Sequence, residues 1–124
     1  PSAQAINEIY GQMMAGRFKN VGVFFQSVVD HMPNVTVKLW QWMRLKMLPS
    51  PTKFHYTFTL RELSRVFQGL LRTPRSSVPD SKTLIQLWRH ENERVFADKL
   101  TTLADKELFA EQLEGFTKEL LESA

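Results

Sequence analysis

The 124-residue sequence contains no cysteine. Disulfides, thiolate nucleophiles and thiolate metal ligands are therefore excluded, and the composition fits a reducing, cytosolic compartment. The apolar runs are only a few residues long, which argues against a transmembrane helix, and the N-terminus lacks the pattern of a signal peptide. Because the chain also begins without Met, we expect it to be a fragment of a longer protein.

The common nucleotide and metal motifs are also missing. There is no GxxxxGK[ST] and no GxGxxG, so we expect no phosphate-binding loop within this chain. His90-Glu91 begins like the zinc-protease motif HExxH, but Arg94 stands where the second histidine would be. His31, His55 and His90 share no ligand spacing, so we expect structural or surface roles for them. No serine lies in a GxSxG motif. The sequence thus predicts no catalytic residue and no metal site.

The sequence also has little excess of one sign of charge. It contains 16 basic and 13 acidic residues, so the net charge is only +3. These charges are spread evenly, and no basic stripe predicts binding to nucleic acid. The absence of long apolar spans likewise predicts no membrane insertion. At 43% hydrophobic residues the chain can bury a core, and we expect residues 1–124 to form a single domain.

Helical periodicity runs through almost the whole sequence, with apolar residues recurring at spacings of three and four. Proline at position 33 favours a new helix start there, and the segment TPRSSVPD is a clear break. The predicted class is all-α, a compact bundle of five to seven helices. The helices are expected at about 2–16, 21–32, 33–48, 59–72, 81–100, 104–113 and 115–122.

The stretch FTLRELSRVFQGLL, residues 58–71, predicts a firmly started helix. Thr59 and Glu62 have the spacing of a capping box. Arg61 lies in the first turn, where the helix dipole makes a cation unfavourable by about 0.3–1 kcal/mol unless an anion is near. Arg65 follows one turn later on the same exposed face, because the leucines and Phe67 form the buried stripe.

Two interpretations of Arg61 and Arg65 stay open at this point. Both side chains could be solvated surface arginines that pair with a nearby carboxylate. Alternatively, Arg61 could meet a phosphate, since guanidinium geometry suits phosphate oxygens and a helix N-terminus favours an anion. Composition and spacing do not choose between them.

Three segments resemble dynein heavy chains. FHYTFTLRELSRVFQGLL is similar to the family's "H-Y-x-F-N-L-R-D-L-S-R-V-F-Q-G". LWRHENERVFADKL is similar to "L-W-R-H-E-x-x-R-V-F-x-D-R-L", and LPSPTKFHY is similar to "L-P-T-P-x-K-x-H-Y". In that family these stretches belong to the small helical lid of a AAA+ module. Within the family, the sequence of these segments resembles the lid of the third module of the ring. It is more similar to axonemal than to cytoplasmic heavy chains.

The resemblance implies a lid over ATP or ADP with Mg, held mostly by a large α/β subdomain that precedes the lid. Arg61 falls on the sensor 2 position, whose implied role is contact with the γ-phosphate, and Arg65 is a second, weaker candidate. Thr59 and Glu62 support this helix start. The fragment by itself is not expected to be an enzyme or to hold nucleotide, whereas the parent chain would be an ATP-driven microtubule motor.

The resemblance also implies partners. They are the large subdomain of the same module and the neighbouring module, for which Arg89, Glu91 and Arg94 are candidate contacts. Microtubules would be reached only through a distant stalk, and dynein intermediate and light chains would join the parent complex. The expected location is cytoplasmic, in a ciliary or flagellar axoneme and its cytoskeleton.

The sequence departs mildly from the family wording. Thr59 replaces Asn and Glu62 replaces Asp, and both still suit a helix start. Asn92 and Lys99 replace Cys and Arg, and Lys99 would weaken a bidentate contact there. The alternative function is an all-α interaction module whose exposed arginines bind an acidic protein partner without nucleotide.

Overall fold

The computed structural model describes residues 2–53 and 56–123. Within these ranges the chain forms five α-helices and two short 3-10 turns, and no strand. The all-α class predicted from the periodicity is therefore confirmed. The elements are α1 (Ala3–Arg17), α2 (Val23–Lys46), α3 (Leu60–Arg72), η1 (Arg75–Ser77), α4 (Ser81–Phe96), η2 (Ala97–Lys99) and α5 (Leu103–Glu122).

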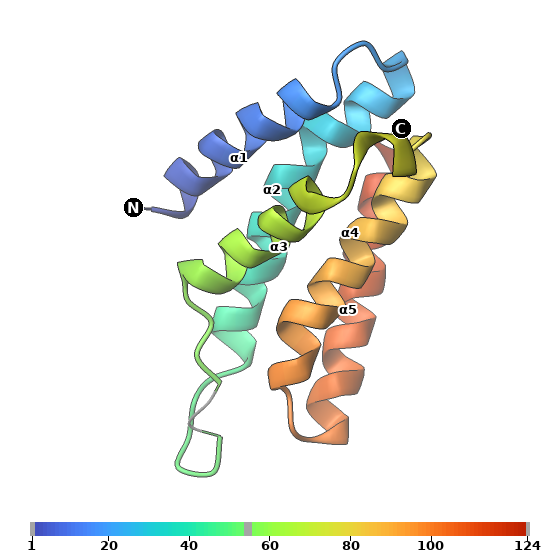
Figure 1. Cartoon of the computed structure of the whole chain (residues 1–124). Helices are drawn as coiled ribbons and strands as arrows, with labels where there is room; N and C mark the ends of the chain where they lie inside the picture. Colours follow the sequence, from blue (N-terminus) through green and yellow to red (C-terminus); the bar gives the residue numbers. More distant parts are fainter. Residues whose placement is uncertain (1, 54–55, 124) are drawn as a thin grey trace.

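The longest helix, α2, organises the bundle (Figure 1). It packs against α1, α4 and α5, and α3 crosses it and packs against α4 and α1. Helices α4 and α5 run side by side. This arrangement presents one long face of α3 to the outside and encloses its other face.

The core lies where α2, α3 and α4 meet. The side chains of this centre are fully shielded from solvent because each helix repeats apolar residues at spacings of three and four. Burial of each such side chain contributes about 1.5–3 kcal/mol relative to exposure. Core members with no exposed surface include Val28, Met32, Leu39, Met43, Leu63, Val66, Phe67, Leu84, Trp88 and Phe96.

Helix α2 corrects the prediction of two separate helices at 21–32 and 33–48. It is one continuous helix with Pro33 inside it. A proline in a helix interior removes one backbone hydrogen bond and costs about 3 kcal/mol. Pro33 is buried here, and its Cγ lies 3.7 Å from where a Cβ on Gly11 of α1 would stand. Met32 and Val35 are also buried, so packing holds the helix together across the proline.

The C-terminal part of the chain differs from the prediction in the same way. The predicted helices 104–113 and 115–122 are the single helix α5. Gly115 is exposed inside it, and one glycine weakens a helix by only about 0.5–1 kcal/mol. Leu113 and Leu120 are buried on either side of the glycine. Their packing carries the helix past it.

Helix α4 is shorter than the predicted 81–100, since it ends at Phe96 and continues only as the 3-10 turn η2. Its start is capped by Asp80, whose Oδ1 accepts a hydrogen bond from the Thr83 N–H at 2.8 Å. In the turn between α1 and α2, Asn20 has a φ of 62°, a left-handed value that asparagine tolerates. None of the helices in the described part of the chain is long and apolar enough to cross a membrane.

Candidate functional site

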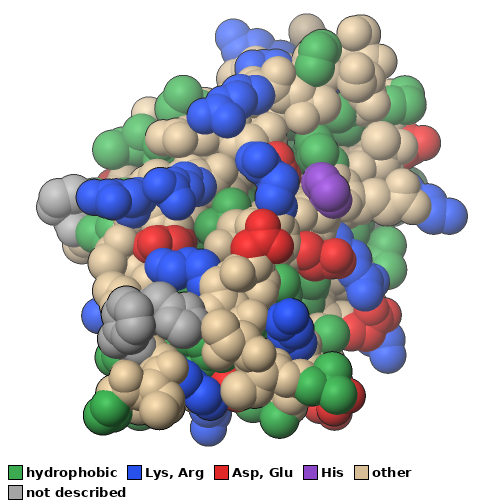
Figure 2. Space-filling view, turned by 60° about the horizontal axis from the view of Figure 1, so that its bottom comes forward, with side chains coloured by type: hydrophobic (Ala, Val, Ile, Leu, Met, Phe, Trp, Pro, Cys, Tyr) green, Lys and Arg blue, Asp and Glu red, His purple; other side chains and the backbone are tan. Residues whose placement is uncertain are grey.

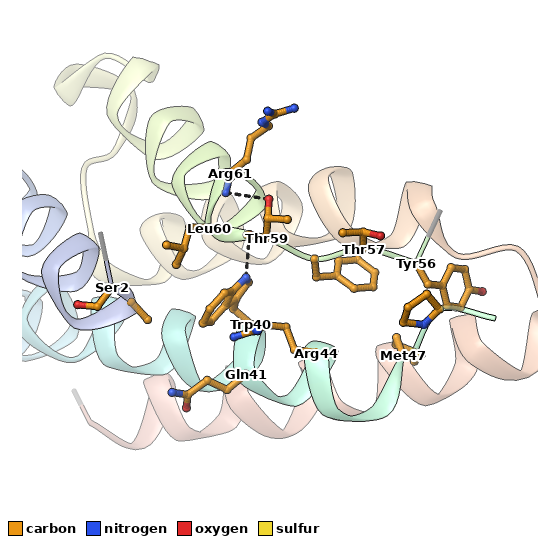
Figure 3. A pocket seen from close by; sticks show the side chains of 13 residues that line it. Ser2, Trp40, Gln41, Arg44, Met47, Tyr56, Thr57, Thr59, Leu60 and Arg61 are labelled. Atoms are coloured by element: carbon orange, nitrogen blue, oxygen red, sulfur yellow. Dashed lines mark hydrogen bonds between the residues drawn. The ribbon is translucent and has the colours of Figure 1, made fainter. Parts of the chain in front are cut away.

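Helix α3 starts with the capping box that its sequence predicts. Oε2 of Glu62 accepts hydrogen bonds from the Thr59 N–H at 2.7 Å and from the Thr59 hydroxyl at 2.8 Å. The Arg61 N–H in turn donates to Oγ1 of Thr59 at 3.2 Å (Figure 3). Because these bonds satisfy backbone groups that a helix end leaves open, the first turn of α3 is held in one conformation.

Helix α2 fixes this start in space through Trp40. Its indole N–H donates to the carbonyl oxygen of Thr59 at 2.9 Å, and the residue is only 4% exposed. One turn further along α2, the guanidinium of Arg44 lies 4.7 Å from the centre of the Trp40 ring. The cap of α3 is thus tied to the longest helix of the bundle (Figure 3).

An ion pair ties the same cap to the turn after α4. Nζ of Lys99 donates to Oε1 of Glu62 at 2.9 Å and also to the carbonyl oxygen of Thr57. Burial alone would raise the pKa of the Glu62 carboxyl. Hydrogen bonds from Lys99 and from the Thr59 hydroxyl and N–H outweigh burial and hold this pKa below its usual value. The carboxylate therefore stays charged at neutral pH.

The segment that leads into α3 is anchored to α5 by a second cluster. The Tyr56 hydroxyl donates to Oδ2 of Asp105 at 2.9 Å and accepts from the Thr101 N–H at 2.9 Å. Lys53 donates to the same Oδ2 at 2.8 Å, and this hydrogen bond lowers the pKa of Asp105. Both sides of the α3 start are therefore supported by side chains from distant parts of the sequence.

Arg61 stands on this supported start with its side chain in solvent. Figure 3 shows the guanidinium extending away from Trp40 and from the body of the chain. Arg61 makes no side-chain hydrogen bond or ion pair with any other residue that the structure describes. The nearest acid in sequence, Glu62, is already engaged by Thr59 and Lys99. The Glu62 carboxylate in the first turn offsets the helix dipole, but the Arg61 guanidinium itself has no ion-pair partner among the described residues.

A cleft of about 970 Å³ opens beside Arg61, between α2 and the segment that leads into α3. Trp40, Arg44 and Leu60 line it (Figure 3). Sequence reasoning pointed to Arg61 but missed this cleft. Its α2 side comes from residues about 20 positions earlier, so no local spacing could have indicated it.

Arg65 is exposed one turn further along α3. It shares the outer face of the helix with Arg61, as the apolar stripe predicts. However, it borders a different hollow, between α3 and α4, together with Arg72, Arg94 and Lys99. The structure therefore does not bring Arg61 and Arg65 to one cleft.

The three residues suggested as contacts to a neighbouring module lie on α4. Arg89 is engaged within the chain, with Glu114 at 2.7 Å and Glu93 at 3.3 Å. Arg94 is 54% exposed in its side chain and pairs with Glu91 at 3.2 Å. A role for Arg89 and Arg94 in contacts between modules stays a prediction.

Glu91 is the most enclosed of the three, with 7% of its surface exposed. Its carboxylate lies over Gly69 of α3, so that a Cβ at position 69 would fall 2.3 Å from Oε1. Most of this side chain is therefore used between α3 and α4, which leaves little of it to reach another module.

The two histidines that the structure describes, His31 and His90, lie on different helices, α2 and α4. His31 is exposed, with Nδ1 2.8 Å from the carbonyl oxygen of Ser27, and His90 is exposed on α4. His55 lies outside the described residues. Among the residues that the structure describes, no three His, Asp or Glu side chains are placed to hold a metal ion. Figure 2 shows basic side chains with acidic ones among them on the face it presents, rather than one continuous basic area.

Comparison with known proteins identifies the bundle. The sequence model of one family, described as "AAA+ lid domain", matches residues 32–123, which is more than half of the chain. The chain belongs to the AAA+ lid domain family. This agrees with the five-helix architecture, and it places the capped start of α3 within the matched part of the lid.

Relatives of this lid are found among dynein heavy chains. Dynein axonemal heavy chain 5 of Mus musculus is 37% identical over 122 residues, which cover 96% of this chain and 3% of the relative. The flagellar outer-arm dynein gamma chain of Chlamydomonas reinhardtii is 41% identical over 124 aligned residues, covering 86% of this chain and 3% of the relative. Dynein axonemal heavy chain 8 of Mus musculus is 40% identical over 116 residues, which cover 91% of this chain and 2% of the relative.

These matches confirm the resemblance to dynein heavy chains, and the relatives named here are axonemal or flagellar chains. The lid spans only 2–3% of the length of these relatives. Its place as the third module of a ring stays a prediction.

Proposed function

We propose that this AAA+ lid covers and senses a nucleotide held by the large α/β subdomain of the same module, with Arg61 contacting the γ-phosphate. One observation carries the proposal. Arg61 is an exposed cation without an ion-pair partner among the residues that the structure describes, on a helix start fixed by the capping box and by Trp40.

The charge and shape of this guanidinium suit a phosphate group. It presents paired N–H donors that match phosphate oxygens, and the N-terminus of α3 adds a favourable dipole toward an anion. A terminal phosphate would therefore supply the ion-pair partner that no described residue gives the Arg61 guanidinium. When that phosphate is lost, its contact with Arg61 is lost as well, and the closed arrangement of lid and large subdomain becomes less stable.

The supports of the α3 start make such a contact mechanically useful. Trp40 links the start to α2, and the pair of Glu62 with Lys99 links it to the turn after α4. A displacement of the α3 start would therefore be passed on to α2 and to this turn. This is the property required of a lid whose angle reports the nucleotide state.

The resemblance to dynein heavy chains supports a division of labour between the lid and the large subdomain. ATP or ADP with Mg would be held by the large subdomain, and the lid would supply Arg61; Arg65 borders a different hollow and is not included in this contact. By analogy with the dynein relatives, the longer chain would be an ATP-driven microtubule motor in the axoneme of a cilium or flagellum. Its microtubule contact and its intermediate and light chains would lie outside this lid.

Nucleotide affinity of the longer heavy chain that contains this lid provides the test. Arg61→Ala should weaken binding of ATP about tenfold or more and binding of ADP much less, because only ATP has the γ-phosphate. Arg61→Lys should retain part of the preference. Lys118→Ala, at an exposed position of α5, serves as the control. Equal losses for ATP and ADP, or no loss, would contradict the proposal.

The alternative, an interaction module for an acidic partner, remains a separate proposal because carboxylates also suit an unpaired guanidinium. The nucleotide affinities distinguish the two proposals when they are combined with a measurement of protein binding by the same variant. If Arg61→Ala leaves ATP and ADP affinity unchanged and releases a bound protein, the partner interpretation is the one that holds.

A further inference from the structure

The outer face of α3 carries a second surface beyond Arg61. Two hollows flank the helix there, one of about 380 Å³ between α1 and α3 and one of about 530 Å³ between α3 and α4. Gln68 and Arg72 line both hollows. Because the two share these residues, they adjoin each other across α3, and we call them together the α3 surface.

The α1 side of this surface is apolar. Ile9 is 55% exposed and Met13 is 49% exposed, and Leu71 lines the same hollow. Ile9 and Met13 belong to one face of α1, four residues apart. Exposed apolar side chains that adjoin on a hollowed surface are typical of sites that another protein segment covers.

The α4 side is basic. Arg65, Arg72, Arg94 and Lys99 line it, and Asp98 is the acid among its lining residues. Arg94 and Lys99 already pair with carboxylates of the chain. Arg65 and Arg72 make no ion pair or side-chain hydrogen bond with any described residue, and both are exposed. Two guanidiniums are therefore available at this edge.

We propose that the α3 surface docks an acidic amphipathic helix of a partner protein. Its apolar side would cover Ile9 and Met13, and its carboxylates would pair with Arg65 and Arg72. These arginines are seven residues apart, so about 10 Å separates their positions along α3. Carboxylates two turns apart on a partner helix have the same spacing.

The composition of the surface favours a polypeptide over a phosphate ligand. A phosphate or nucleotide would use the basic hollow and leave Ile9 and Met13 in water. An amphipathic helix uses both halves at once, since apolar contact supplies affinity and the charge pairs set orientation. The proposal does not depend on Arg61, which is left unchanged in every variant below.

The probe is a synthetic helical peptide of about four turns, with leucines on one face and glutamates on the other. Its binding to the 124-residue chain is followed by fluorescence anisotropy. A twin peptide carries glutamine in place of glutamate. We expect the glutamate peptide to bind at least about tenfold more tightly than its twin, with an affinity that falls as salt rises.

Two double variants divide the surface. Arg65→Gln with Arg72→Gln removes the charges, and Ile9→Ser with Met13→Ser removes the apolar contact. Each should weaken binding of the glutamate peptide about tenfold. All four residues are exposed, and circular dichroism checks that the variants are folded.

Matched controls lie on α5. Lys106→Gln with Lys118→Gln removes two exposed cations, and Leu108→Ser with Leu121→Ser removes two exposed apolar side chains. Both should bind the peptide within about twofold of the original chain.

Four results would overturn the proposal. The first is no binding of the glutamate peptide, and the second is equal weakening by the α3 and α5 variants, which would show that binding is not specific to the α3 surface. The third is displacement of the peptide by ATP, which would assign the surface to a nucleotide. The fourth is self-association in sedimentation that Ile9→Ser with Met13→Ser abolishes, which would assign it to a second copy of the chain.

Discussion

The carboxylate of Glu91 occupies the space that any side chain at position 69 would need. A Cβ on Gly69 would lie 2.3 Å from Oε1 and 2.5 Å from Cδ of Glu91. Helices α3 and α4 thus approach each other through a glycine on one side and an acidic side chain on the other. The outer end of that side chain pairs with Arg94 at 3.2 Å.

This contact predicts coupling between Gly69 and Glu91. Gly69→Ala alone should change the free energy of unfolding by less than about 1 kcal/mol, because better helix propensity offsets displacement of the flexible carboxylate. In a Glu91→Ala chain the same substitution should stabilise by about 0.5–1 kcal/mol, since nothing has to move. Urea unfolding of the four chains measures the difference. Identical effects in both backgrounds would show that the two residues do not compete for space.

The pair of Glu62 with Lys99 predicts a loss of stability when the cation is removed. Glu62 is 5% exposed, so Lys99→Met would leave a buried carboxylate with only the Thr59 donors, at a cost of about 1–3 kcal/mol. Lys82→Met, at an exposed position on α4, should stay within about 0.5 kcal/mol. Chemical denaturation tests this. A Lys99→Met chain as stable as the control would mean that the ion pair contributes nothing.

The lowered pKa of Glu62 predicts how this contribution depends on pH. A carboxyl whose folded pKa is depressed stabilises above its unfolded value, about 4.3, and loses this stabilisation as pH falls through the folded pKa. The stability difference between the original chain and Glu62→Gln should therefore be constant at neutral pH and shrink below about pH 4.

The test compares the free energy of unfolding of the original chain with that of Glu62→Gln, because the pKa values of Asp80 and Asp105 are lowered too. Both chains should thus lose stability in acid, and only the gap between them reports Glu62. Urea unfolding at a series of pH values gives this gap. A gap that widens as the pH falls would reverse the sign and refute the assignment.

Local signals in the sequence predicted the start of α3 correctly. A capping box needs only Thr59 and the residue three positions later, and the exposure of Arg61 follows from the apolar stripe that buries Leu63 and Phe67. The resemblance to dynein lids rests on continuous stretches as well. Features carried by neighbouring residues are therefore accessible without coordinates.

The failures have a common physical cause, which is packing between distant segments. Pro33 signalled a helix break, yet its burial near Gly11 and the buried residues around it keep α2 intact. Lys99 and Asp105 reach Glu62 and Tyr56 from far along the chain. No spacing rule connects such residues, so the supports of the site became visible only in the folded chain.

The hydrogen bond from Trp40 to Thr59 predicts a specific effect of losing one donor. Trp40→Phe keeps an aromatic ring but removes the N–H that binds the Thr59 carbonyl at 2.9 Å, which should cost about 1 kcal/mol beyond the loss of packing. Trp42 is half-buried, and its N–H has no partner among the described residues. Trp42→Phe should therefore be milder. Thermal unfolding followed by circular dichroism compares the two variants without relying on tryptophan fluorescence.

The same pair of variants also tests whether the position of the cap matters for Arg61. If Trp40 sets where α3 begins, Trp40→Phe in the longer heavy chain should weaken ATP binding while Trp42→Phe does not, because only Trp40→Phe releases Thr59, the N-cap residue of the helix that carries Arg61. Trp40 is more buried than Trp42, so the loss of stability measured for each variant is compared with its loss of ATP affinity. Equal ATP affinity combined with the expected loss of stability would show that Trp40 supports the fold and leaves the orientation of Arg61 to other contacts.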